Sequence, residues 1–176
     1  MNYFSLYLKG LICFCLLFIT MDSHALSIDK GYRQNKIKDL ALIYQGGVHR
    51  IDWTSDQFLP YVVHQFADGH KDWLFDGFLF LEFLDRLFED GKALSALDRC
   101  IGTQIKEIGK PDFTHQIVLC LPEVLPGQKD WGEVDGEPMD FSRQEDQVKA
   151  TRWYIDELMK RFKQAKYKHL KLSGFY

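Results

Sequence analysis

Short, almost wholly apolar runs alternate along this chain with longer segments in which apolar residues recur every three or four positions. The apolar runs are residues 40–44, 73–84 and 115–121, and a fourth begins at His169. Runs of this kind are typical of strands buried on both faces, as in parallel sheets. This alternation constrains the fold more than any other feature, because it predicts four buried strands with a helix between each strand and the next.

The first predicted helix begins at a capping-box spacing. Thr54 stands three residues before Gln57, and apolar residues then recur at helical intervals as far as Phe66, where Asp68 and Gly69 end the pattern. We expect a helix of about three turns in this segment.

The other two predicted helices are longer. The second has apolar residues at helical spacing over residues 94–108 and ends at Gly109 and Pro111. The third opens at Ser142, which forms a second capping-box spacing with Glu145. The residues expected on its inner face are Val148, Ile155, Met159 and Phe162.

Strands that alternate with helices pair in parallel through right-handed crossovers. An open doubly wound sheet and a (β/α) barrel both use this order. A nucleotide-binding sheet is disfavoured because Gln45-Gly46-Gly47-Val48 is too generic to cradle phosphates. A barrel needs eight strands and about 250 residues, whereas this chain has 176. The predicted fold class is therefore α/β: a partial (β/α) TIM-like barrel of about four parallel strands and three crossover helices, with the C-terminal half missing.

Residues 1–25 are predicted to be a signal peptide. The apolar run over residues 10–21 is followed by Ser23-His24-Ala25, after which cleavage is expected. The alternative is a retained membrane anchor, for which this run is short. The expected location is secreted, periplasmic or at the cell surface, with no stable membrane insertion after cleavage. Residues 26–37 would form a linker, and residues 38–176 the half-barrel domain.

Charge and cysteine content limit the expected partners. The chain carries 22 Lys and Arg against 25 Asp and Glu, a net charge of -3, so no nucleic-acid partner is expected. Cys100 and Cys120 would remain after cleavage and could pair in an oxidising compartment, but both fall in apolar segments where a buried free thiol is the alternative. A half barrel would also expose strand edges, through which a dimer could form.

The connection over residues 122–141 is too long for an ordinary loop, and loops of this length usually have a function. Its acidic residues do not match the calcium-binding EF-hand spacing, and no histidine in the chain has a zinc-binding spacing. We therefore expect no metal and no other cofactor. The acidic residues of this connection are Asp130, Glu133, Asp135, Glu137 and Asp140.

Several segments between Lys38 and Tyr176 together resemble one known family. They are residues 39–44 (DLALIY), 73–81 (WLFDGFLFL), 117–122 (IVLCLP), 139–142 (MDFS), 153–157 (WYIDE) and 172–176 (LSGFY). The chain resembles the secreted bacterial family catalogued as domain of unknown function 4855, whose members look like glycoside-hydrolase-type barrels. In that family the closing Gly-Phe-Tyr continues as Trp and soon afterwards a Glu. Related sugar-cleaving barrels carry their acid/base on the fourth strand and their nucleophile on the seventh, so the resemblance implies that both lie beyond Tyr176.

The candidate site is expected at the C-terminal ends of the predicted strands, as in other barrels. Glu82 and Glu123 follow neighbouring strands and are the candidate catalytic carboxylates, because glycoside hydrolysis needs two such groups. The alternative is that Glu82 pairs with Arg86 and that Glu123 is solvated. The candidate substrate-binding residues are Tyr44, Gln45, Asp85, Trp131 and Tyr176, whose aromatic members could stack on sugar rings or could simply be core.

Three functional hypotheses follow. The first is an exported glycoside-hydrolase-like protein that acts on or binds a polysaccharide and is present here as its first half. The second is a carbohydrate-binding or surface-interaction module without catalysis. The third is an inactive, truncated product. Mutating Glu82 and Glu123 to Gln discriminates the first two, because only hydrolysis depends on both carboxylates.

Overall fold

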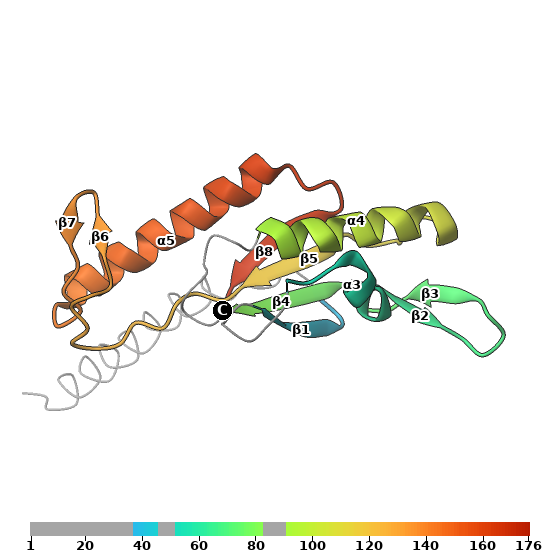
Figure 1. Cartoon of the computed structure of the whole chain (residues 1–176), viewed down its shortest axis with the longest axis horizontal. Helices are drawn as coiled ribbons and strands as arrows, with labels where there is room; N and C mark the ends of the chain where they lie inside the picture. Colours follow the sequence, from blue (N-terminus) through green and yellow to red (C-terminus); the bar gives the residue numbers. More distant parts are fainter. Residues whose placement is uncertain (1–36, 46–51, 83–90) are drawn as a thin grey trace, which may run out of the picture. The chain divides into compact units, whose positions relative to one another are not determined.

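The computed structural model describes residues 37–45, 52–82 and 91–176, which belong to one unit over residues 37–176. The predicted signal peptide and all of the predicted linker except Ile37 lie outside the described residues. Four strands of the described part form one parallel sheet in sequence order (Figure 1). They are β1 (Leu40–Gln45), β4 (Gly77–Glu82), β5 (His115–Leu119) and β8 (Leu170–Phe175). The predicted parallel α/β arrangement is confirmed.

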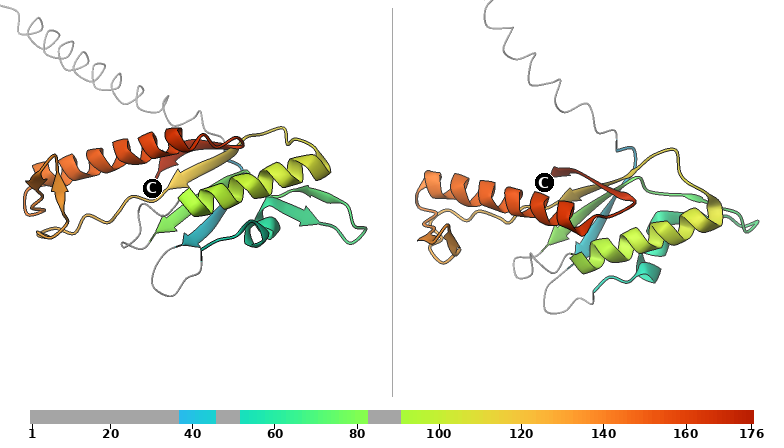
Figure 2. Two further views of the ribbon diagram at one scale, coloured as in Figure 1. Left: turned by 45° about the horizontal axis from the view of Figure 1, so that its top comes forward. Right: turned by 90° about the horizontal axis from the view of Figure 1, so that it is seen from above.

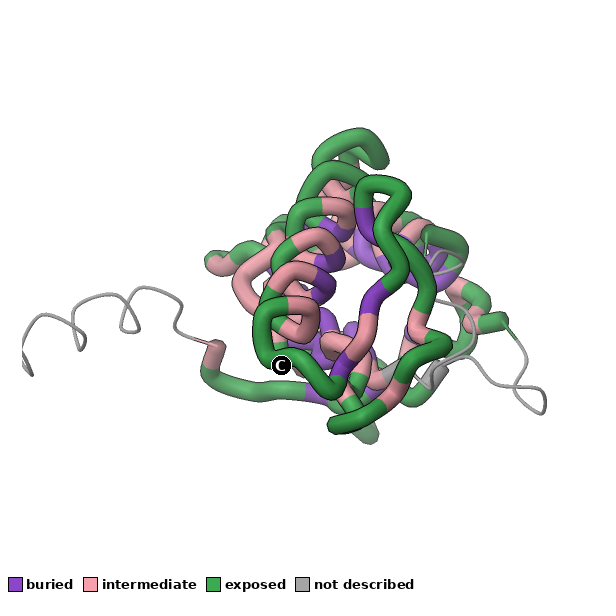
Figure 3. Tube along the Cα trace, turned by 90° about the vertical axis from the view of Figure 1, so that its left-hand side faces the viewer, coloured by how far each residue is buried: buried purple, intermediate pink, exposed green. Residues whose placement is uncertain are grey.

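Three helices cover the same face of this sheet (Figure 2). They are α3 (Ser55–Val62), α4 (Gly91–Ile108) and α5 (Gln144–Ala165). Every second strand residue joins one core with the helices, and burial of each large apolar side chain contributes about 1.5–3 kcal/mol. Figure 3 shows the buried residues on the inward sides of helices and strands. The core includes Ile43, Phe78, Phe80, Ile117 and Leu119 from the strands, and Phe58, Leu97, Ile101, Tyr154 and Leu158 from the helices.

The opposite face of the sheet carries apolar side chains that no described helix covers. The strand register places Leu42 of β1 beside Leu79 of β4, and Leu79 beside Val118 of β5. Leu79 is 7% exposed and Val118 is partly exposed, whereas at the sheet edge Leu40, Leu42 and Tyr44 are 41%, 47% and 44% exposed. We call this surface the uncovered face.

A β-bulge interrupts the pairing of β5 with β8. Ile117 pairs with Leu172, but Val118 pairs with Gly174, so Ser173 is an extra residue in β8. The hydroxyl of Ser173 donates to the Oε1 atom of Gln116 at 3.1 Å. Beyond the bulge, Phe175 lies opposite Leu119 and packs against the helix-covered core.

The first helix is shorter than predicted. The Thr54–Gln57 capping box is present, but α3 ends at Val62 and the chain continues directly into β2 (Val63–Gln65). Pro60 within the helix and the two β-branched valines favour this ending, because both disfavour helix continuation. Phe66 therefore lies after β2 and not on a helix, which corrects the prediction.

The predicted second strand is two separate strands. Trp73 belongs to β3 (Lys71–Trp73), which pairs antiparallel with β2, and the parallel strand β4 begins only at Gly77. A Cβ atom at Gly77 would collide with the side chain of Ile37, so the glycine permits close packing. The run over residues 73–81 contains one turn signal, Asp76-Gly77, which stands at this break, but the apolar residues on both sides of it favour a single strand.

The second helix is as expected. α4 ends at Ile108, and Gly109, with a φ of +85°, donates its N–H to the carbonyl of Ile105 at 3.1 Å. Such a left-handed glycine is a common helix terminator. The last helix differs from expectation at its start, because Arg143 is the N-cap and the hydroxyl of Ser142 donates to Asp140 instead.

The inner face of α5 is the predicted one only in part, because Phe162 packs against the core as predicted but Val148 and Met159 do not. Its buried residues are Ala150, Tyr154 and Leu158, whereas Val148 and Met159 are 42% and 51% exposed. A 22-residue helix is about 33 Å long, compared with about 20 Å for a six-residue strand. The first half of α5 therefore extends beyond the carboxyl ends of the strands (Figure 1).

The long connection after β5 contains a small hairpin. β6 (Glu133–Val134) and β7 (Glu137–Pro138) pair around Asp135 and Gly136, both of which have positive φ. This is the backbone of the tight hairpin turns that Asp-Gly favours. The hairpin packs on the first half of α5 in a second apolar cluster, which contains Val134, Met139, Phe141 and Ala150.

Cys100 is buried and Cys120 is partly exposed, and the two do not form a disulfide with each other. Within the described residues, no helix combines the length and the apolar character needed to cross a membrane.

Candidate functional site

The carboxyl ends of the four parallel strands meet at one edge of the sheet. Tyr44 pairs with Leu81, and Gln45 pairs with Glu82 in the backbone register. On the other side of the sheet, the N–H of Leu121 donates to the carbonyl of Tyr176 at 2.8 Å. The structure therefore brings Tyr44, Gln45, Glu82 and Tyr176 to the same edge, which we call the carboxyl edge. This is where parallel α/β folds place ligands.

Two tyrosines are the accessible aromatic residues of this edge. Tyr44 is 44% exposed and Tyr176 is 74% exposed. The strand alternation places both rings on the uncovered face, because Tyr44 follows the exposed Leu42 by two residues and Tyr176 follows the core-facing Phe175 by one. They stand on the two outer strands, three strand spacings or about 14 Å apart.

The end of β1 is held in place by a residue of the following segment. The indole Nε1 of Trp53 donates to the backbone carbonyl of Tyr44 at 2.9 Å. Trp53 itself stacks on the buried Phe58 of α3 with ring centroids 4.8 Å apart. The backbone of Tyr44 is therefore anchored to the core while its ring remains accessible.

The predicted carboxylates occupy different surroundings. Glu82 ends β4 beside Gln45, and the side chains of both residues lie outside the described part, as does Asp85. Glu123 follows β5 in the long connection and is exposed. Among the described residues, Glu123 makes no ion pair.

Trp131 does not join this group. Its ring packs against Phe141 with centroids 5.5 Å apart and meets the ring of Trp153 edge-on at 6.1 Å. The indole is half-buried in the second apolar cluster, where it fastens the hairpin to α5. Tyr154, one residue after Trp153 on α5, is 2% exposed and packs in the main core.

A shallow cavity beside the carboxyl edge was not predicted from the sequence. It has a volume of about 430 Å³ and lies between the connection after β5 and the first half of α5. Gln147 donates to the carbonyl of Phe141 at 2.6 Å, so its amide is already engaged. Polar residues at helical spacing resemble any solvated helix face, which gives no signal for a cavity. The lining residues are Val124, Gln144, Gln147, Val148, Thr151 and Arg152.

The acidic residues of the hairpin are bound to nearby donors. The ammonium group of Lys149 hydrogen-bonds to Glu137 and lowers the pKa of that carboxyl. Hydrogen bonds from Ser142 lower the pKa of Asp140, with a smaller effect of Lys129. Within the described ranges, no three His, Cys, Asp or Glu side chains are grouped so that they could hold a metal ion.

Two buried polar residues, Asp76 and His115, lie at the opposite, amino end of the sheet. His115, the first residue of β5, is 1% exposed and its Nε2 atom has no hydrogen-bond partner. Burial lowers the pKa of His115 to about 4 against the opposing effect of Asp76. The ring of Trp73 contacts it edge-on at 5.3 Å. Because ligands of parallel sheets bind at the carboxyl edge, we assign these residues to the core.

A comparison with protein families gives one match. The family described as Domain of unknown function (DUF4855) matches residues 39–176. The chain belongs to this family. The DUF4855 match therefore spans the whole parallel sheet and its three helices, including both tyrosines of the carboxyl edge. No curated protein and no solved structure matches the chain.

Proposed function

We propose that this DUF4855 domain binds a polysaccharide at the carboxyl edge and that its sheet is part of a (β/α) barrel. The strand order supports the barrel, because each crossover adds the next strand on the same side and every described helix lies on one face. A doubly wound sheet would instead reverse direction and place helices on both faces.

The uncovered face fits the inside of such a barrel. Barrel interiors are packed with apolar side chains from alternate positions of the strands, and the row of Leu42, Leu79 and Val118 has this character. The flank of α5 that exposes Val148 and Met159 fits the position where a further barrel helix would pack.

The observation that carries the binding proposal is the pair of exposed rings at the carboxyl edge. Tyr44 and Tyr176 each offer a flat apolar surface with a polar edge, which suits the C–H face of a sugar ring. Their separation of about 14 Å favours an extended chain of sugars over a single sugar.

Hydrolysis is the second candidate function. Glu82 and Glu123 follow neighbouring strands, and glycosidases place two carboxyl groups about 5–9.5 Å apart. The solvent-exposed position of Glu123 favours ligand binding over proton donation, because glycosidase acids usually sit in apolar surroundings. We further propose export of the protein, on the basis of the apolar pattern over residues 1–25.

The experiment measures binding of the full chain to a panel of soluble polysaccharides by affinity electrophoresis. The double variant Tyr44→Ala/Tyr176→Ala is expected to bind about tenfold more weakly, because two stacking surfaces are lost. Leu42→Ala is the matched control, since Leu42 is 47% exposed on the same strand and face but lies away from the edge. Equal affinity of the double variant and the unmodified chain would overturn the proposal.

A second assay separates binding from hydrolysis. Release of reducing ends from any bound polysaccharide is measured for the unmodified chain and for Glu82→Gln and Glu123→Gln. Activity that both variants lose supports hydrolysis, whereas binding without release of reducing ends supports the binding function alone.

A further inference from the structure

The last part of the chain has a charge opposite to that of the whole. Residues 158–176 contain no Asp or Glu, although the net charge of the chain is -3. A concentration of one charge sign on an acidic chain is a surface property that the fold does not require. The six basic residues of this segment are Lys160, Arg161, Lys163, Lys166, Lys168 and Lys171.

Most of these cations have no acidic partner within the part of the chain that the structure describes. Glu157 accepts from Arg161 at 2.8 Å and from Lys160 at 3.1 Å, and it is the only carboxylate among the described residues that pairs with this segment. Lys163, Lys166 and Lys168 are exposed and take part in no ion pair of the described structure. Their charge is therefore available to a partner.

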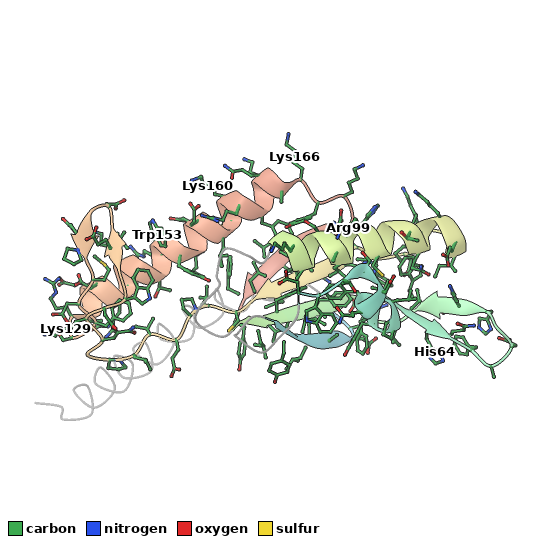
Figure 4. All side chains as sticks on the ribbon, in the orientation of Figure 1. His64, Arg99, Lys129, Trp153, Lys160 and Lys166 are labelled. Atoms are coloured by element: carbon green, nitrogen blue, oxygen red, sulfur yellow. The ribbon has the colours of Figure 1, made fainter. Side chains whose placement is uncertain are left out.

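Arg99 of α4 is a further cation beside this segment. Asp98 accepts from the backbone N–H groups of His169 at 2.8 Å and Lys168 at 3.2 Å, which fixes the segment after α5 against α4. The neighbouring Arg99 is exposed and also lacks an ion-pair partner among the described residues. Figure 4 shows Lys160 and Lys166 on the outer side of α5 and Arg99 on α4. We define the basic ridge as Arg99, Lys160, Lys163, Lys166 and Lys168.

Lys166 occupies a position where a lysine is not the residue best suited to folding. It is the C-cap of α5 and adopts the left-handed conformation, with a φ of +52°. Glycine is the usual residue in this conformation, since other residues have a steric cost there. Residues that do not suit their local backbone conformation are expected mainly at functional positions, and Lys166 is such a residue.

The ridge has the shape of a polymer-binding surface. Its cations lie on the outside of α5, in the segment that follows α5, and on α4. Tyr167 stands between Lys166 and Lys168, half-buried, with its ring held edge-on against Phe162 at 5.1 Å. A fixed aromatic ring flanked by cations suits a sugar that carries a carboxylate better than a bare phosphate.

We propose that the basic ridge binds an acidic polysaccharide, a polymer whose sugars carry carboxylate groups. The choice of a polysaccharide as the polyanion rests on the proposed function. The C-terminal end of α5, where most of the ridge lies, is near the amino ends of the strands. The carboxyl edge is at the opposite ends of the same strands, so the two surfaces are separate.

The experiment compares two polymers with one backbone. Polygalacturonate is acidic, and its fully methyl-esterified form has no carboxylates. The full chain is expected to bind polygalacturonate at least tenfold more tightly at 50 mM salt, and raising the salt to 200 mM is expected to weaken this binding about tenfold. Equal binding of the two polymers would overturn the proposal.

Variants locate the binding to the ridge. Lys163→Gln/Lys166→Gln/Lys168→Gln is expected to reduce polygalacturonate affinity to that of the ester. The control Lys92→Gln/Lys106→Gln/Lys110→Gln removes the same charge from α4 and the segment after it, and is expected to retain the affinity. An equal loss in both variants would refute a specific ridge, because it would show an effect of net charge alone.

The single variant Lys166→Gly separates binding from folding. It relieves the left-handed lysine, so its melting temperature is expected to rise, while polygalacturonate affinity is expected to fall several-fold. Unchanged affinity in this more stable variant would count against the ridge.

Two further arms distinguish this proposal from others. Vesicles of phosphatidylglycerol that bind as tightly as polygalacturonate, with the same ridge dependence, would replace the polysaccharide with a membrane surface and overturn the proposal. Tyr44→Ala/Tyr176→Ala is expected to lose binding of neutral polysaccharides and to retain the preference for polygalacturonate. Binding of neutral polysaccharides therefore tests the carboxyl edge, and the preference for polygalacturonate tests the ridge.

Discussion

The carboxylate of Asp76, which is buried at the start of β4, accepts a hydrogen bond from the backbone N–H of Asp39 at 2.9 Å. It also accepts from the N–H of Lys38 at 3.0 Å, and its own carbonyl accepts from the N–H of Gln116 at 2.8 Å. One acidic residue thus ties the entry of β1 to β4, and its backbone continues the connection to β5.

Asp76→Ala is expected to lower the free energy of unfolding by about 1–3 kcal/mol, because two partly buried backbone N–H groups lose a charged acceptor. Asp76→Asn keeps an acceptor oxygen and is expected to cost less. Urea unfolding measures both, with the exposed Asp112→Ala as control. A midpoint of Asp76→Ala equal to that of the control would show that Asp76 does not hold the start of β1.

Stability is expected to fall as the pH falls from 6.5 to 4, the interval between the ordinary pKa of histidine and that of His115. Burial lowers this pKa in the native state, so the unfolded chain binds a proton that the folded chain excludes, and the effect is roughly 3 kcal/mol in total. Chemical unfolding at several pH values measures it. His115→Leu is expected to flatten this part of the profile, and a slope unchanged by the substitution would assign it to other groups.

The two described thiols are expected to differ in reactivity. Burial, together with Asp56 and Glu107, raises the pKa of Cys100 to about 11, whereas Cys120 is partly exposed. Because the thiolate is the reactive form, iodoacetamide at pH 8 should modify Cys120 in the native protein and Cys100 only after unfolding. Peptide mass spectrometry follows each site. Equal rates for the two cysteines in the native state would contradict the burial of Cys100.

The uncovered face is expected to drive association between copies of the chain. Leu42 is 47% exposed on an edge strand, and Leu42→Lys places a charge there without disturbing the helix-covered core. We expect concentration-dependent association of the unmodified chain and weaker association of the variant, measured by light scattering after size-exclusion chromatography. Leu125→Lys is the control, with similar exposure of 43% in the connection after β5. A chain that remains monomeric at all concentrations would refute this expectation.

The strand segments could be predicted from the sequence because apolar runs at Leu40, His115 and Leu170 admit few alternatives. The end of α3 and the start of β4 were not predicted, since Phe66 and Trp73 are as apolar as the core residues beside them and Asp76-Gly77 is the only turn signal between β3 and β4. Apolar residues on α5 lie on two neighbouring flanks, and only the packing of Tyr154 against the sheet decides which flank is buried.

The candidate site could also be predicted only in part. Tyr44 and Tyr176 could be placed at one edge because parallel strands share the direction of their ends. The position of Trp131 depends on the hairpin around Asp135, which folds the long connection back onto α5. Four of the five residues of the basic ridge lie close together in the sequence, but the position of Arg99 could not be predicted, because it depends on the contact of Asp98 with a segment about 70 residues away.

The bulge at Ser173 decides the fate of two adjacent aromatic rings. If Ser173 paired as a regular strand residue and no bulge formed, the alternation of β8 would turn Phe175 outward to water and direct Tyr176 into the hydrophobic interior. Deletion of Ser173 would remove the bulge and leave Phe175 opposite Leu119, so the bulge lets β8 carry one additional residue without changing the face on which either ring lies.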